Sequence, residues 1–148
     1  MAGYSGTPLP TKLGIKPGAN VGLIGAPDGF EALLDPLPPA VTMRRQIRKP
    51  LDVIVAFFPR RAAFERRLPA LTAALDPDGG LWVAWPKKAS GVVTDMREDV
   101  IREVALPTGL VDNKVCAIDD TWSGLRLVIR RELRPARISP RPAGTVRT

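Results

Sequence analysis

The sequence predicts an α/β fold in three layers: a mostly parallel β-sheet between helices, completed by an antiparallel hairpin at the C-terminal end. The first indication is a set of nearly continuous apolar runs at residues 21–27, 51–59 and 81–86, each ended by a proline, as expected of strands buried on both faces. The second is a helical pattern at residues 60–75, because the order strand, helix, strand is that of a right-handed parallel crossover. The third is a pair of strand-like segments near the end of the chain, joined by a short polar connection.

The first fifty residues predict short elements, because Gly and Pro recur among them. Residues 1–19 are expected to form an irregular lead-in with one helical turn near Lys12. A short helix should follow residue 29, since three prolines within the next ten residues prevent its extension. Residues 41–47 alternate apolar and polar side chains, which predicts a strand near an edge of the sheet.

An amphipathic helix is predicted over residues 60–75, where an apolar stripe at helical spacing lies opposite arginines. The stripe consists of Phe64, Leu68, Leu71 and Leu75. Pro69 lies inside this helix and should kink it or begin a second segment. The sequence DPDGG, residues 76–80, predicts a turn before the next strand.

Asp95 and Glu98 have the spacing of a capping box, so a helix is predicted over residues 96–106. Residues 114–119 and 125–132 predict two strands, because the intervening sequence DTWSG is a plausible hairpin connection. The last strand should therefore run antiparallel to the rest of the sheet.

Most of the net charge of +7 lies at the C-terminal end. Residues 130–148 hold six arginines and one acid, which accounts for +5, and they lack aromatic residues. The chain is therefore expected to divide into the lead-in (1–19), a single domain (20–132) and a flexible basic tail rich in Pro and Arg (133–148). The tail is interpreted as a solvated extension, and the alternative is transient contact with nucleic acid or acidic lipid. Without aromatic residues, nucleic-acid binding by the tail would be non-specific and salt-sensitive.

Several kinds of site are excluded by composition. The chain has no histidine and a single cysteine, Cys116, so Ser-His-Asp and Cys-His catalysis, an internal disulfide and a multi-cysteine metal site are all impossible. Cys116 has apolar neighbours and is interpreted as a small core residue, and no metal is predicted. No apolar run approaches the roughly 20 residues that a membrane span needs, and no leader sequence is recognised. We therefore expect a cytoplasmic protein without a membrane partner.

Polar residues follow four of the predicted strands, at the edge where open parallel sheets bind ligands. The candidate ligand-binding residues at these positions are Pro27, Asp28, Gly29, Arg60, Lys87, Lys88, Ser90, Asp119 and Trp122. Their mixture of cations and carboxylates suits an anionic small molecule or a complementary protein surface, and the alternative is a solvated rim with internal ion pairs. The lysine pair is no phosphate loop, because the GxxxxGK[ST] pattern is absent. No catalytic residue is assigned.

The three tryptophans are expected to have two different roles. Trp82 and Trp85 are three residues apart in one strand, so they should face opposite sides of the sheet as core residues. Trp122 lies in a predicted connection, where a large aromatic side chain could cap the ligand rim or form part of a partner surface.

The element order, with the turn and strand LDPDGGLWVAWP at its centre and an antiparallel hairpin at its end, resembles the Rossmann-like core of class I S-adenosylmethionine-dependent methyltransferases in truncated form. The segments IGAPDGFEALL, AWPKKASGVVTD and GLVDNKVCAIDDTWSGLRLV also resemble a small, mainly actinobacterial family of uncharacterised proteins. This second resemblance covers most of residues 7–130. It implies a bacterial protein with a methyltransferase-like fold and implies no particular activity.

The residues that would hold S-adenosylmethionine depart from the pattern that the resemblance implies, which is a glycine-rich loop after the first strand and an acidic residue after the second. The first loop reads GAPDG at residues 25–29, with a proline where the backbone must approach the cofactor. The second strand ends in QIRK at residues 46–49, without an acid. We therefore predict no cofactor and a non-catalytic domain that binds a ligand or a protein partner, with a regulatory role.

Two alternatives remain open from the sequence. One is a residual S-adenosylmethionine-dependent methyltransferase, or another nucleotide-using enzyme, with Asp28, Lys87 and Asp119 at its site. The other is nucleic-acid binding driven by the basic tail.

Overall fold

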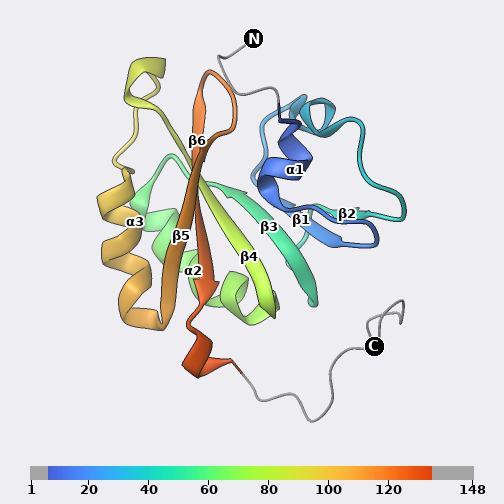
Figure 1. Cartoon of the computed structure of the whole chain (residues 1–148). Coiled ribbons are helices and arrows are strands. Elements are labelled where there is room, and N and C mark those ends of the chain that lie inside the picture. Colours follow the sequence, from blue (N-terminus) through green and yellow to red (C-terminus); the bar gives the residue numbers. More distant parts are fainter. Residues whose placement is uncertain (1–6, 135–148) are drawn as a thin grey trace.

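The computed structural model describes residues 7–134, which form a single six-stranded sheet with helices on both faces (Figure 1). The strands are β1 (Asn20–Ile24), β2 (Thr42–Arg44), β3 (Leu51–Phe57), β4 (Leu75–Pro86), β5 (Leu110–Ala117) and β6 (Trp122–Ile129). Their order across the sheet is β2-β1-β3-β4-β6-β5. The first four strands pair in parallel, whereas β6 is antiparallel to both of its neighbours, so β5 has the same direction as β4. The predicted fold class is confirmed.

The helices pack on the sheet in two groups (Figure 1). The α-helices are α1 (Leu9–Leu13), α2 (Arg61–Ala74) and α3 (Glu98–Ala105), and the short 3-10 helices are η1 (Phe30–Leu34), η2 (Lys88–Ser90), η3 (Leu106–Thr108) and η4 (Arg131–Leu133). One group, α2 and α3, buries Phe64, Leu68 and Ile101 against the sheet. None of the described helices is long and apolar enough to span a membrane.

The opposite face of the sheet is covered by α1 and η1. Leu13 is buried there, and its carbonyl accepts a hydrogen bond of 2.9 Å from the indole N–H of Trp82. The helical turn predicted near Lys12 is therefore α1, and it is attached to the centre of the sheet. Trp85 packs in the other cluster, so the prediction that Trp82 and Trp85 lie on opposite faces is confirmed.

The structure corrects one local prediction and narrows another. The residues expected to form a turn at 76–80 belong to β4, where Leu51 pairs with Leu75 but Val53 pairs with Gly80. These extra residues form an irregularity in the strand, because β3 has fewer residues over the same length. Helix α2 continues through Pro69 as one element, so no second segment begins there.

The predicted capping box is also wrong. Helix α3 begins after Arg97, with no hydrogen bond from a capping side chain. Asp95 instead accepts a hydrogen bond of 2.6 Å from the backbone N–H of Arg61, the first residue of α2. The carboxylate therefore satisfies one of the free N–H groups at the start of a different helix.

The remaining elements differ from prediction mainly in length. The edge strand predicted over residues 41–47 is the three-residue β2, at the end of the sheet. Both hairpin strands begin earlier than predicted, so Trp122 lies in β6 rather than in the connection. Residues 135–148 of the predicted basic tail lie outside the described part of the chain.

Candidate functional site

The predicted ligand residues lie at one edge of the sheet, because β1, β3, β4 and β5 run in the same direction. Trp122 is the first residue of β6, and the others lie on the segments that follow β1, β3, β4 and β5. The loop after β4 contacts the β5–β6 hairpin through a backbone hydrogen bond of 2.7 Å from Lys87 N to the Thr121 carbonyl. Aromatic rings link the other loops: Phe57, at the end of β3, contacts both Phe30 and Trp122 edge-on, with ring centroids 4.9 and 5.0 Å apart. The sequence therefore predicted correctly that these loops share one edge.

Trp122 has a packing role in the structure, through its contact with Phe57. Its side chain is partly buried on Phe57, which is itself buried and lies beside Phe30 of η1. Edge-to-face contacts of this kind stabilise by about 0.5–1.5 kcal/mol beyond the apolar area that they bury. The three rings therefore fill the space over the carboxyl ends of β1 and β3, on the face of the sheet that α1 and η1 cover.

Two predicted ligand residues hold their own loops together. Asp119 Oδ1 accepts hydrogen bonds of 2.8 Å from the backbone N–H groups of both Thr121 and Trp122. Ser90 Oγ donates to the Lys87 carbonyl at 2.7 Å and accepts from Val92 N at 3.2 Å. These are the local side-chain-to-backbone bonds typical of polar residues in tight turns.

The other predicted residues differ in exposure. Asp28 and Gly29 are exposed just before η1, where Gly29 has a φ of +82°, and Pro27 is partly buried. Arg60 is exposed at the start of α2, in contrast to Arg61, which forms ion pairs with Glu65 and Glu103. The hydrogen bond to Glu65 is the main cause that raises the pKa of Arg61.

A cavity of about 540 Å³ lies beside the end of β4, on the side of the sheet that α3 covers. We call it the β4-end cavity, and its lining residues are Trp85, Pro86, Lys88, Gly91, Val92, Val93, Thr94, Met96 and Arg97. Its volume lies within the range of about 300–1,000 Å³ usual for small-molecule sites. Lys88 is the predicted ligand residue that the structure places there.

The cavity combines an apolar wall with two cations. Val92 and Val93 are 45% and 74% exposed, although large apolar side chains are usually buried. Met96 and Trp85, which line the same cavity, belong to the buried core. Lys88 and Arg97 supply the positive charge. The sequence interpretation missed these valines and Arg97, and two adjacent valines in a loop without strand or helix pattern were the signal that could have indicated them.

The loop that forms this cavity is fixed by hydrogen bonds to the end of β3. Thr94 Oγ1 donates to the Pro59 carbonyl at 2.6 Å and accepts from Met96 N at 3.0 Å. Asp95 adds its bond to the start of α2. The loop geometry is therefore set by the protein itself, which lowers the conformational entropy that a ligand would have to remove.

The described residues form no candidate metal site. Within residues 7–134, no group of three or more Asp, Glu, Cys or His side chains is placed to hold an ion.

Comparison with known proteins identifies the fold of this chain. No protein-family model and no curated protein matches the sequence. Solved structures match: the ribosomal protein L11 methylase from Lactobacillus delbrueckii subsp. bulgaricus superposes with a TM-score of 0.57 and 13% identity, over 83% of this chain and 75% of that one.

Two further solved structures give the same result. Magnesium protoporphyrin IX methyltransferase from Synechocystis PCC 6803, with bound S-adenosylmethionine, has a TM-score of 0.58 and 15% identity, over 82% of this chain and 74% of that one. A protein assigned to the type 11 methyltransferases from Sulfolobus solfataricus has a TM-score of 0.60 and 14% identity, covering 82% and 89%. The chain therefore has a methyltransferase-like Rossmann fold, and at these identities the likeness extends to the fold alone.

Proposed function

We propose that this chain is a non-catalytic domain that binds a small molecule with an anionic group and an apolar body, in the β4-end cavity. The observation that carries the proposal is the lining of that cavity, in which Lys88 and Arg97 stand beside an apolar wall. Such a lining favours a carboxylate or phosphate joined to a hydrocarbon, because the cations fix the anionic group while Val92 and Val93 cover apolar atoms. Binding without turnover suits a regulatory role.

The other edge loops support a binding role over methyl transfer. In the fold family, the cofactor would meet the loops after β1 and β2, but β2 ends at Arg44 and no carboxylate follows it for the ribose hydroxyls. The next residue, Arg45, forms an ion pair with Glu31 of η1. Arg48 and Lys49, the exposed cations that follow, disfavour a sulfonium, and Pro27 in the β1 loop limits the approach of the backbone. These residues do not fit S-adenosylmethionine.

The second candidate is the residual methyltransferase, which the fold comparison favours, since each of the structures compared above is a methyltransferase. In that function Asp28 and Lys87 would contact the substrate or cofactor. Asp119 is a weaker candidate, because its Oδ1 already accepts two backbone hydrogen bonds. The resemblance to an actinobacterial family, the cytoplasmic location and nucleic-acid binding by the tail stay predictions.

Calorimetric titration of the full chain would test the proposal, with decanoate as the probe and decanol and decyltrimethylammonium as matched ligands. Decanoate should bind at least about tenfold more tightly than either, because a hydrogen bond to a charged group contributes about 1.5–3 kcal/mol. Replacement of both Lys88 and Arg97 by Gln should remove this preference, whereas Lys49→Gln, an exposed cation elsewhere, should leave it unchanged.

The same titration separates the two candidates. Equal binding of decanoate and decanol, or a preference that survives the Lys88 and Arg97 substitutions, would contradict the proposed cavity. Binding of S-adenosylmethionine and S-adenosylhomocysteine, with loss of binding in Asp28→Asn, would replace it by the methyltransferase candidate. A phosphate-bearing nucleotide serves as the third ligand, because it tests the cations without the sulfonium.

A further inference from the structure

Exposed arginines gather on the part of the molecule that contains β2, the connection from β2 to β3, and α2. We call them the arginine surface, which consists of Arg44, Arg48, Arg60, Arg66 and Arg67. None of these side chains forms an ion pair with a carboxylate of residues 7–134. None of them lines the β4-end cavity, so the arginine surface is separate from the ligand site proposed above.

The arginines of β2 and of the connection belong to the face of the sheet that α2 covers. Met43 packs in the cluster on the opposite face, so its neighbour in the strand, Arg44, points to the α2 side. Ile47 packs against the cluster that contains the buried side chains of α2 and α3. The connection therefore crosses β1 on the α2 face, because β1 lies between β2 and β3 in the sheet, and Arg48 is exposed beside Ile47.

Helix α2 carries its charged side chains on two different flanks. On the flank next to α3, Arg61 forms ion pairs with Glu65 and with Glu103 of α3. Arg67 comes two residues after Glu65, about 200° around the helix axis, so it lies on the flank away from α3. Because α3 contacts β5 at one end of the sheet, that flank faces the other end, which β1 and β2 form.

The acids of this face lie at the α3 end of it. Several carboxylates on α2, α3 and β5 pair with Arg61 or Arg102, namely Glu65, Glu98, Asp99, Glu103 and Asp112. By contrast, residues 36–51, which include β2 and the connection, contain no Asp or Glu. The α3 end of the face is therefore neutralised by ion pairs, whereas the arginine surface keeps its positive charge.

We propose that the arginine surface binds a nucleic-acid duplex through its phosphate groups. A guanidinium presents parallel N–H donors that match two oxygens of a phosphate, which favours arginine over lysine for this contact. Arg60 and Arg67 are seven residues apart, about 10 Å along α2, and a duplex carries about six phosphates over that length. Several arginines can therefore contact phosphates at the same time.

The side chains around these arginines favour a duplex over other polyanions. Proteins usually hold single strands with exposed aromatic rings, and amphipathic segments bind membrane surfaces with apolar side chains that insert among the lipids. The large apolar side chains exposed in the described residues are Leu33, Leu37, Val92, Val93, Val115 and Leu133, and none belongs to residues 44–48 or 60–67. Phosphate contacts alone carry no sequence information, so binding should not depend on the base sequence.

Fluorescence anisotropy of the full chain with labelled DNA and RNA duplexes of about 20 base pairs would test the proposal. The chain should bind at least one of them, with equal affinity for duplexes of unrelated sequence. A variant that combines Arg48→Gln, Arg66→Gln and Arg67→Gln should bind at least about tenfold more weakly at low salt. The slope of log K against log salt should also fall by about two to three, because each lost phosphate contact removes about 0.9.

A charge-matched control removes the same number of arginines from the C-terminal end of the chain. It combines Arg137→Gln, Arg141→Gln and Arg147→Gln, so the two variants have equal net charge and differ only in where the charge is lost. The control should keep the affinity of the natural chain within about threefold. Urea denaturation should show equal stability for both variants and the natural chain, since the arginines replaced on the arginine surface are exposed.

Three results would overturn the proposal. The first is that the natural chain binds neither duplex. The second is an equal loss of affinity in the two variants, which would assign the binding to net charge or to the C-terminal arginines. The third is tighter binding to polyglutamate or to phosphatidylserine vesicles than to either duplex, because the arginine surface would then fit an acidic protein or a membrane.

Discussion

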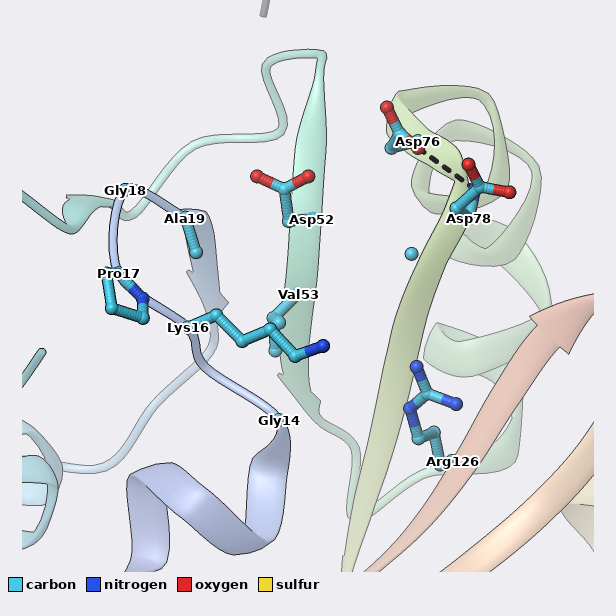
Figure 2. Close-up of a pocket in the computed structure, with 11 residues that line it drawn as sticks. Gly14, Lys16, Pro17, Gly18, Ala19, Asp52, Val53, Asp76, Asp78 and Arg126 are labelled. Atoms are coloured by element: carbon cyan, nitrogen blue, oxygen red, sulfur yellow. Dashed lines mark hydrogen bonds between the residues drawn. The ribbon is translucent and has the colours of Figure 1, made fainter. Parts of the chain in front are cut away.

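The two edges of the sheet use polar residues in different ways. At the carboxyl edge, where the parallel strands end, Ser90 and Asp119 form hydrogen bonds with the backbone of their own loops. Aromatic rings fill the space between these loops. At the opposite, amino edge, where the parallel strands begin, Lys16 and Arg126 line a cavity of about 370 Å³ (Figure 2) and form no ion pair with a described carboxylate. A position at the usual ligand edge of a parallel sheet therefore does not make a polar residue a ligand residue, since its hydrogen bonds decide whether it is available.

The largest effect should come from the aromatic contacts at the carboxyl edge. Phe57→Ala removes a buried ring that contacts both Phe30 and Trp122, and should lower the free energy of unfolding by about 3–5 kcal/mol. Urea denaturation measures this loss, and Leu33→Ala, at an exposed position, is the control with an expected change within about 0.5 kcal/mol. Similar losses for the two variants would mean that the rings do not hold this edge together.

A smaller effect tests whether Asp119 is a loop residue. Asp119→Ala should lower the free energy of unfolding by about 1–2 kcal/mol, because two backbone N–H groups lose their acceptor. Asp119→Asn keeps an acceptor oxygen and should retain most of the stability in the same denaturation experiment. If Asp119→Asn proved as destabilising as Asp119→Ala, the negative charge of Asp119 would stabilise the fold more than its turn does. The carboxyl edge would then resemble the amino edge, where charged side chains line a cavity, more closely.

The central part of the fold could be predicted from the sequence because its signals are local. Apolar runs as continuous as residues 81–86 occur in strands that are covered on both faces, and β4 is such a strand. The alternation of strand side chains likewise placed Trp82 and Trp85 in different clusters. The hydrogen bond that Asp95 accepts from the backbone N–H of Arg61 could not be predicted, because it joins residues 34 positions apart and competes with a local pattern that points to a different helix.

The sites were less predictable than the fold for the same reason. Parallel strand direction predicted the shared edge of the candidate loops, and the short spacing from Asp119 to Thr121 could have indicated its turn. The cavity at the amino edge gave no such signal, since Lys16 and Arg126 are 110 positions apart in the sequence and line the same cavity only in the folded chain.

The hydrogen bond of Asp95 gives a third prediction, because it joins the β4-end cavity to α2. Asp95→Ala should lower the free energy of unfolding by about 0.5–1 kcal/mol, the usual effect of losing an acceptor at a helix N-terminus. Asp95→Asn should retain most of this contribution in thermal or urea denaturation. Unchanged stability in Asp95→Ala would contradict this role of the carboxylate.

The smallest effect concerns Cys116, which lies on β5, away from both cavities. Burial is the main cause that raises the pKa of the Cys116 thiol, whereas the positive charge of Lys12 lowers it. The folded chain therefore favours the neutral thiol, and this contribution to stability is fully present below the pKa of the unfolded chain and is lost as the pH rises through the folded pKa. Because the thiolate is the reactive form, the midpoint of the pH profile for alkylation by iodoacetamide should lie higher in the folded chain than in urea.

Lys12 provides the sharper test of this last prediction. Lys12→Gln should move the alkylation midpoint of the folded chain to still higher pH, because the charge that opposes the effect of burial is removed. Lys49→Gln, at an exposed position beyond β2, should leave the midpoint unchanged. A midpoint in the folded chain equal to that in urea would mean that the thiol is solvated, and that the side of β5 facing α1 is more open than the structure describes.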